Sequence, residues 1–205
     1  MFNWKNRESI GDGVWVLKDF LTPEAFAGIK KEIRTTPAEW HTRYHNRIIS
    51  ENGDYPLCHQ LGGRLLPHLH DLFNETYNLS TARAYLDLSG CRIFPHFDSK
   101  EFAVNVQIYL SDIEYPELGT QFCFNTEINE RAELNEQEFM KSLGRSPESE
   151  FKTIPFKPNW GYINYNNPRK IHRTRIVPDG AIRESLHLNF RKSDGINQGL
   201  ELNWK

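Results

Sequence analysis

The clearest pattern in the chain is a two-residue alternation of apolar and polar positions over residues 103–110. An extended strand points successive side chains to opposite faces, so this segment predicts a strand with two different faces. One face is apolar and carries Val104, Val106, Ile108 and Leu110. The other face carries Ala103, Asn105, Gln107 and Tyr109. The polar side chains of this second face need hydrogen-bond partners if the strand is buried.

Other segments rich in β-forming residues also predict strands. They cover residues 13–20, 84–88, 91–97, 118–124, 161–165, 173–177 and 184–190. Within them, Pro95 lacks a backbone N–H and therefore indicates an edge or a bend in the segment 91–97. A polar, aromatic stretch from Trp40 to Asp54 is predicted as a loop or an edge strand.

Two helices are predicted before most of the strands. Thr22 is a suitable N-cap, Pro23 suits the first helical position, and the helix ends at residues 35–37. Its apolar face is formed by Phe26, Ile29 and Ile33. A second helix is predicted over residues 62–77, with Pro67 in its first turns. Its apolar face is formed by Leu65, Leu69, Leu72 and Phe73.

Two helices and about eight short strands favour an α+β protein. The architecture predicted is a double-stranded β-helix, an antiparallel jelly-roll barrel, with supporting N-terminal helices. The length of 205 residues predicts a single domain over residues 1–205. Residues 126–152 are rich in glutamate and predict a charged, partly helical insertion between strands. This insertion is either a solvated excursion or a lid over a site.

Composition excludes several classes of protein. The formal net charge is −2, hydrophobic residues make up 38% and aromatic residues 13%, which disfavours a disordered chain and a strongly basic nucleic-acid binder. No apolar run is long enough to span a bilayer, and the first residues lack the apolar core of a signal peptide. Cys58, Cys91 and Cys123 have no metal-site or disulfide spacing and indicate free thiols in a reducing, cytoplasmic compartment.

A His-x-Asp triplet is the first candidate for chemistry. His96 and Asp98 are two residues apart, so on a strand both side chains point to one face. With a distant histidine they form a 2-His-1-carboxylate set, which leaves metal positions open and suits non-haem Fe(II). The alternative is a hydrogen-bonded histidine–aspartate pair on the surface.

The second candidate is a hairpin that begins at His172. A turn over residues 178–180 follows, and Arg183 then opens the returning strand. Arginine is suited to bidentate binding of a carboxylate, and Ser185 shares the face of Arg183. The alternatives are a surface arginine paired with Glu184 and a histidine in a basic loop.

These parts together resemble a known family, the Fe(II)- and 2-oxoglutarate-dependent dioxygenases, in their prolyl-hydroxylase-like branch. The resemblance spans residues 13–191 and rests on the order of its parts. These are residues 16–24, 96–98, 107–112 and 117–120, then His172 and residues 183–186.

The resemblance implies a set of site residues. His96, Asp98 and His172 are expected to hold Fe(II), and Arg183 to bind the distal carboxylate of 2-oxoglutarate. Further candidate contacts to this co-substrate are Tyr109, Ser185, Tyr85 and His187, of which Tyr85 has the alternative of a packed aromatic. The implied reaction consumes O2, hydroxylates a C–H bond of a small molecule or an amino-acid side chain, and releases succinate and CO2.

Candidates for the substrate itself are Asn105, Gln107, Arg43 and Trp160, although Trp160 can equally be a packing residue. Residues 40–47 and the basic residues around His172 are expected to form an electropositive rim for an anionic substrate, or else to be solvated surface charges. The basic residues are Arg169, Lys170, Arg173 and Arg175.

Two other functions stay open. The first is a jelly-roll binding or sensor protein without turnover. The second is a cupin-like metalloenzyme that does not use 2-oxoglutarate, which leaves Arg183 without a role. A nucleic-acid demethylase is disfavoured because the chain has no basic stripe rich in aromatic residues. The sequence predicts no oligomeric state.

Overall fold

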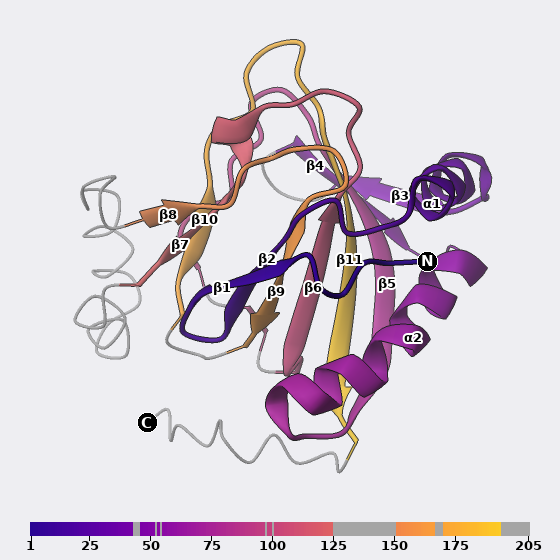
Figure 1. The fold of residues 1–205 in the computed structure, drawn as a ribbon. Coiled ribbons are helices and arrows are strands. Elements are labelled where there is room, and N and C mark those ends of the chain that lie inside the picture. Colours follow the sequence, from indigo (N-terminus) through magenta and orange to yellow (C-terminus); the bar gives the residue numbers. More distant parts are fainter. Residues whose placement is uncertain are drawn as a thin grey trace.

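Two antiparallel sheets form the centre of the computed structural model (Figure 1). It describes residues 1–42, 46–51, 53, 55–96, 98, 99, 101–124, 151–166 and 170–193. The larger sheet has the order β1-β2-β9-β6-β11-β5-β4-β3. These strands are β1 (Arg7–Gly11), β2 (Val14–Leu17), β9 (Gly161–Tyr165), β6 (Val104–Tyr109), β11 (Arg183–Lys192), β5 (Tyr77–Asp87), β4 (Arg47–Glu51) and β3 (Glu39–Thr42).

The smaller sheet has the order β10-β7-β8. Its strands are β10 (His172–Thr174), β7 (Thr120–Cys123) and β8 (Phe151–Thr153), and a 3-10 turn, Pro116–Leu118, precedes β7. An apolar cluster that includes Tyr109 and Tyr162 from the larger sheet and Phe122 from the smaller one joins the two sheets. The α+β class and the double-stranded β-helix predicted from the sequence are confirmed.

The alternation predicted for residues 103–110 is confirmed in β6. Val104, Val106 and Ile108 are fully buried in the core that the larger sheet shares with the helices. Asn105 and Gln107 lie on the opposite face, toward the smaller sheet, and line a cavity there. The polar face of one central strand is therefore the floor of the candidate site.

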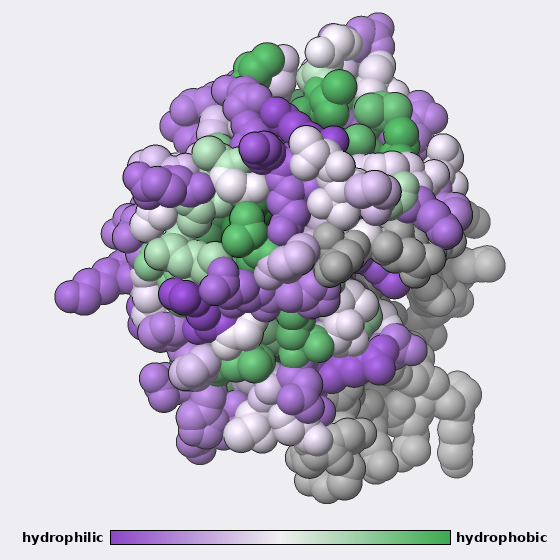
Figure 2. All heavy atoms as spheres, turned by 90° about the vertical axis from the view of Figure 1, so that its right-hand side faces the viewer, coloured by the Kyte–Doolittle hydropathy of each residue, from purple (hydrophilic) through white to green (hydrophobic). Residues whose placement is uncertain are grey.

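Helices α1 (Pro23–Thr35) and α2 (Pro56–Phe73) cover the other face of the larger sheet (Figure 1). Helix α1 begins as predicted, because the Thr22 side chain accepts a hydrogen bond from the Ala25 N–H. On the face that carries these helices, Figure 2 shows small hydrophobic patches separated by hydrophilic side chains. No helix of the described residues is both long and apolar enough to cross a membrane.

The predicted start of the second helix is wrong. Helix α2 begins six residues before the predicted Gly62, so Pro67 lies inside it and not in its first turns. No local side chain caps its start. Instead, the Glu32 carboxylate of α1 accepts hydrogen bonds from the N–H groups of Leu57 and Cys58, at 2.8 and 3.2 Å. A cap supplied by another helix leaves no signal in the neighbouring sequence.

Several strand predictions also need correction. Strand β1 was not predicted, β5 begins seven residues before the predicted Ala84, and the stretch predicted as a loop or edge strand contains β3 and β4. The strand predicted over residues 91–97 does not form among the described residues, where only an isolated bridge joins His96 to His172. Pro95 interrupts the backbone donors of that segment.

Three further predictions concern the charged insertion, the number of domains and the cysteines. The insertion predicted over residues 126–152 lies outside the described residues except at its last two positions, which open β8. The single-domain organisation stays a prediction. The three cysteines are free and buried, as predicted.

Candidate active site

The structure brings His96, Asp98 and His172 together, and their ligand atoms all lie within 4.8 Å of one another. His96 and His172 are joined by two backbone hydrogen bonds, of 3.0 and 3.1 Å, which place their rings side by side. Asp98 follows two residues later, and its carboxylate lies 3.4 Å from Nε2 of His172. The hairpin-like pairing of two distant segments thus assembles the predicted cluster.

The surroundings of this cluster suit a metal site. Nδ1 of His96 donates a hydrogen bond to the Phe94 carbonyl at 2.9 Å, which leaves the lone pair on Nε2 free for a ligand. Nδ1 of His172 is buried and has no hydrogen-bond partner among the described residues. Two imidazoles and one carboxylate, with other positions open, are the donor set that non-haem Fe(II) prefers.

The electrostatics of the cluster favour the protonation states that a metal needs. Burial raises the pKa of Asp98, but His172 and His96 lower it more, so the pKa lies well below its ordinary value. Burial and the neighbouring His172 lower the pKa of His96 to about 4. At neutral pH the cluster therefore contains a carboxylate and an uncharged His96 imidazole.

Asn164 holds Asp98 in place and Lys170 holds Asn164, and the sequence predicted neither of these roles. Asn164 on β9 donates from Nδ2 to Oδ2 of Asp98 at 3.2 Å. Lys170 donates to Oδ1 of Asn164 at 3.2 Å and to the Tyr165 carbonyl at 2.9 Å. Because an ammonium group can only donate, it orients the amide so that its N–H groups face Asp98. Burial lowers the pKa of Lys170 to about 8.

We expect Asn164→Ala and Lys170→Met each to weaken metal binding by about 10- to 100-fold, as is usual when a partner of a metal ligand is removed. The measurement is the affinity of the purified protein for Mn(II) by calorimetry. Lys31→Met, at an exposed position of α1, is the matched control and should bind as the wild type does. Unchanged affinity in both variants would show that Asp98 does not depend on these residues.

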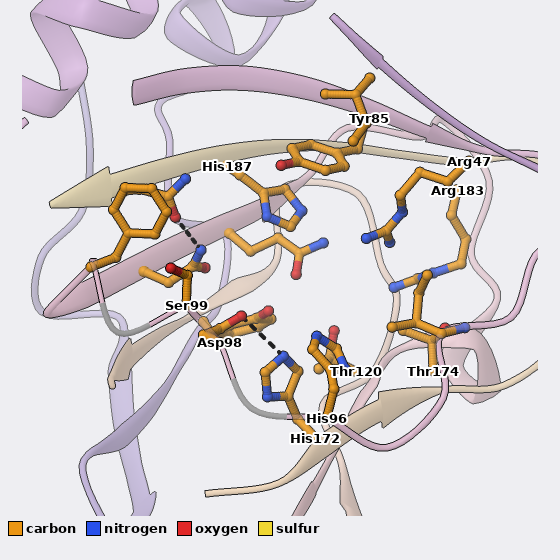
Figure 3. Close-up of a pocket in the computed structure, with 17 residues that line it drawn as sticks. Arg47, Tyr85, His96, Asp98, Ser99, Thr120, His172, Thr174, Arg183 and His187 are labelled. Carbon is orange, nitrogen blue, oxygen red and sulfur yellow. Dashed lines mark hydrogen bonds and ion pairs between the residues drawn. The ribbon is translucent and has the colours of Figure 1, made fainter. Parts of the chain in front are cut away.

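The cluster opens on a cavity of about 330 Å³ between the two sheets (Figure 3). Arg47 and Arg183 lie at one side of it, and Asp98 and Ser99 lie at the other side. The cavity therefore has a cationic end and a metal-binding end, with the floor of the larger sheet between them.

The cationic end is built on a buried carboxylate. Asp87 and Arg183 are each 1% exposed, and Nη1 of Arg183 donates to Asp87 at 2.7 Å. Arg47 binds the same carboxylate through Nε and Nη2, at 2.6 and 2.8 Å. Burial raises the pKa of Asp87, but the two arginines lower it below its ordinary value. Two guanidinium groups on one carboxylate leave a net charge of +1 at this end.

Strand register explains why these three residues meet. Arg183 on β11 pairs with Asp87 on β5, and Asp87 pairs with Arg47 on β4. Directly paired residues point to the same face of a sheet, so the three side chains form one row. The sequence predicted Arg183 as a co-substrate contact and placed Arg47 only in the expected rim of residues 40–47, and it did not predict Asp87. Nε of Arg183 is buried without a hydrogen-bond partner among the described residues.

Four of the other predicted residues divide between the cavity wall and the layer behind it. Tyr85 and His187 line the cavity, with ring centroids 4.0 Å apart. Oγ of Ser185 is hydrogen-bonded to Nε2 of His187 at 3.2 Å, but Ser185 is not among the residues that line the cavity. The Tyr109 hydroxyl lies behind Thr120 and exchanges hydrogen bonds with its N–H and Oγ1. Thr120 takes the position on the wall.

The predicted substrate residues are also divided. Asn105 and Gln107 line the cavity. Trp160 does not; it packs beside the apolar cluster between the sheets, with Lys18 and Lys157 over its ring. Arg43 lies outside the described residues.

The predicted electropositive rim around His172 does not form from its described members. Lys170 and Arg173 are buried, Lys170 beneath Asn164 and Arg173 against Gln121 and the ring of Phe151. Arg175 is exposed, and Arg169 lies outside the described residues. Arg47, from the predicted stretch 40–47, does line the cavity, and together with Arg183 it supplies the positive charge there.

The partly buried imidazole of His187 predicts a pH-dependent stability. Burial and the nearby Arg47 lower its pKa to about 3, whereas in the unfolded chain it is about 6.5. Below pH 6.5 the unfolded state binds the extra proton, so the free energy of unfolding falls as the pH falls, by up to about 1.4 kcal/mol per pH unit. We expect His187→Gln to flatten this slope in denaturant titrations of the metal-free protein between pH 7.5 and 5.

The exposed helix variant His59→Gln is the control for this experiment and should keep the wild-type slope. A slope in His187→Gln equal to that of the wild type would contradict the assignment of an uncharged, partly buried imidazole to His187.

Similarity to known proteins is found among solved structures with the same fold. No protein-family model matches the sequence, and comparison with curated proteins gives no match. HygX from Streptomyces hygroscopicus, solved with nickel, 2-oxoglutarate and hygromycin B, is similar at a TM-score of 0.62 and 15% identity, over 88% of this chain and 83% of HygX.

Two further structures extend this likeness. A prolyl hydroxylase from Trichoplax adhaerens, in complex with a hypoxia-inducible-factor peptide, is similar at a TM-score of 0.60 and 13% identity, over 90% of this chain and 86% of that one. The carbocyclase SnoK from nogalamycin biosynthesis is described as dependent on α-ketoglutarate. It is similar at a TM-score of 0.62 and 8% identity, over 92% of this chain and 81% of SnoK. At these identities the likeness shows a shared fold.

Proposed function

We propose that this protein, which has the fold of the Fe(II)- and 2-oxoglutarate-dependent oxygenases, is an oxygenase of that kind that hydroxylates a C–H bond. The observation that carries the proposal is a single cavity with His96, Asp98 and His172 on its wall and Arg183 at its cationic end. HygX, with the same fold, was solved with nickel and 2-oxoglutarate bound.

The charges of the cavity support this co-substrate. The metal ligands contribute one negative charge through Asp98, so a bound divalent ion leaves +1 at the metal end. The row of Arg47, Asp87 and Arg183 leaves +1 at the other end. A dicarboxylate such as 2-oxoglutarate neutralises both ends at once. Its distal carboxylate would accept from Arg183, whose Nε has no other partner among the described residues.

Each group of residues has its own task in this proposal. His96, Asp98 and His172 would hold Fe(II), and the bound metal would supply the oxidation chemistry that consumes 2-oxoglutarate and O2 and yields succinate and CO2. Asn164 orients Asp98. Tyr85 and His187 pack together on the wall between the two ends and exclude water from the space beside the co-substrate.

Hydroxylation of a small molecule or an amino-acid side chain is the outcome we propose, and relatives of this fold show that other outcomes exist. SnoN is described as an epimerase and SnoK as a carbocyclase. Mass spectrometry of the product separates these cases, because hydroxylation adds one oxygen atom whereas epimerisation leaves the mass unchanged.

The experiment that tests the proposal is succinate formation from 2-oxoglutarate by the purified protein with Fe(II) and O2, over a screen of amino acids, peptides, sugars and nucleotides. We expect succinate in stoichiometric excess over the enzyme. Metal and 2-oxoglutarate that bind without any succinate would favour the binding or sensor protein. Turnover of a substrate without 2-oxoglutarate would favour the cupin-like metalloenzyme.

A further inference from the structure

A row of uncharged polar side chains crosses the larger sheet beside the metal cluster, and two of its members, Asn105 and Asn189, line the cavity. Strand register places Asn164 on β9, Asn105 on β6, Asn189 on β11 and Thr81 on β5 directly opposite one another. Asn105 donates to Asn189 at 2.6 Å, and Asn189 donates to Thr81 at 2.8 Å. We call these two asparagines, together with Thr81, whose hydroxyl accepts from Asn189, the amide row.

The amide row lies at the metal end of the cavity. Asn164, the neighbour of Asn105 in the sheet, donates a hydrogen bond to Asp98, a candidate metal ligand. Arg183 stands six residues from Asn189 on the same strand, with His187 between them. His187 and its strand partner Gln107 line the cavity between the amide row and Arg183. A co-substrate held between Arg183 and the metal would lie over His187 and Gln107 and leave Asn105 and Asn189 to another ligand.

One atom of the amide row has an unfilled hydrogen bond. Asn105 is 7% exposed and lines the cavity, yet its Oδ1 has no hydrogen-bond partner among the described residues. A buried acceptor without a partner destabilises a protein unless a ligand or a water satisfies it. Because Asn105 lines the cavity, a donor group that enters next to the metal cluster would satisfy this acceptor once the side chain turns toward it.

The charges around the row indicate an uncharged ligand. Among the described residues on the cavity wall, Arg47 and Arg183 are opposed by Asp98 and by Asp87, which binds both arginines. A divalent metal and a dianionic co-substrate add no net charge to this balance. A charged group of the substrate beside Asn105 would therefore be buried without a counter-charge on the described wall, which is strongly unfavourable.

We propose that the amide row is a substrate subsite, in which Asn105 Oδ1 accepts a hydrogen bond from an uncharged hydroxyl or N–H group next to the reacting carbon. The ligand class is a neutral, hydroxylated or amide-bearing small molecule, in place of the anionic substrate expected from the sequence. The inference rests on the proposed function, because it takes the metal and 2-oxoglutarate as the neighbours of this subsite.

The test measures binding and does not depend on turnover. The protein is loaded with Mn(II) and 2-oxoglutarate without O2, and matched sets of probes are added in which one scaffold is neutral, phosphorylated or aminated: hexoses, inositols and nucleosides. Thermal shift finds the probes that bind, and calorimetry gives their affinities. We expect binding among the neutral members, and about 10-fold weaker binding of the same probes by Asn105→Leu.

Two further variants make this test specific. Asn105→Asp keeps the shape and the acceptor but adds a negative charge, so it should shift the preference toward the aminated member of a set. Asn78→Leu makes the same change as Asn105→Leu at an exposed position of β5 and should leave probe binding unchanged. The affinity for 2-oxoglutarate is measured on every sample.

The outcomes separate the two proposals. If the wild type does not bind 2-oxoglutarate in the presence of Mn(II), the proposed function fails. If it binds 2-oxoglutarate, the subsite is overturned by binding of charged but not neutral probes, by a failure of every neutral probe, or by equal affinity of Asn105→Leu and wild type for a neutral probe.

Discussion

Replacing Asp98 with alanine is expected to lower the affinity for Mn(II), used in place of Fe(II), at least about 100-fold and to abolish succinate formation with Fe(II). Asp98 is the only anionic donor in the cluster of described ligands, and it is held as a carboxylate by His172 and His96. Its loss removes more than the loss of a residue that only orients a ligand, for which about 10- to 100-fold is typical. Calorimetric Mn(II) titration and a succinate assay measure the two effects.

The matched control for Asp98→Ala is Asp71→Ala, because Asp71 is an exposed aspartate on α2. This control should keep wild-type metal affinity and activity. Retention of both properties by Asp98→Ala in a folded protein would mean that the metal binds elsewhere.

Replacing Arg183 with methionine is expected to weaken 2-oxoglutarate binding about 100-fold, or about 3 kcal/mol, while the affinity for Mn(II) stays within a factor of about three. The guanidinium is buried at the end of the cavity, and its loss leaves a ligand carboxylate there without its main partner. Arg183→Lys keeps the charge but not the planar fork, so it should recover part of the affinity. Calorimetry on the Mn(II)-loaded variants gives these values.

The surface variant Arg191→Met, at an exposed ion pair with Glu101, controls for loss of an arginine. Because Asp87 keeps both hydrogen bonds from Arg47, Arg183→Met should remain folded. Normal 2-oxoglutarate binding by this variant would assign Arg183 only a structural role and favour the cupin-like alternative.

Local patterns explain what could be predicted from the sequence. The two-residue alternation of β6 identifies its cavity face, and the i, i+2 spacing of His96 and Asp98 is a local property of extended chain. His172 and Arg183 were predicted from their order along the chain and the resemblance to a known family. The structure brings the metal cluster together and places Arg183 at the opposite end of the same cavity.

Contacts that depend on tertiary pairing were missed. Asp87 and Arg47 join Arg183 only because three strands pair in one register. Asn164 reaches Asp98 from a different part of the chain, and Lys170 in turn bonds to Asn164. Helix α2 was misplaced for the same reason, since its cap is Glu32 of α1. No spacing within a segment encodes such contacts, so the partners of a predicted site residue are harder to predict than the residue itself.

A crystal structure of the protein with Mn(II) and 2-oxoglutarate, grown without O2, is the best test of whether this cavity holds both the metal and the co-substrate. We expect Mn(II) bound by His96, Asp98 and His172, with the distal carboxylate of 2-oxoglutarate on Arg183. A metal bound by other residues, or a 2-oxoglutarate that makes no contact with Arg183, would contradict it.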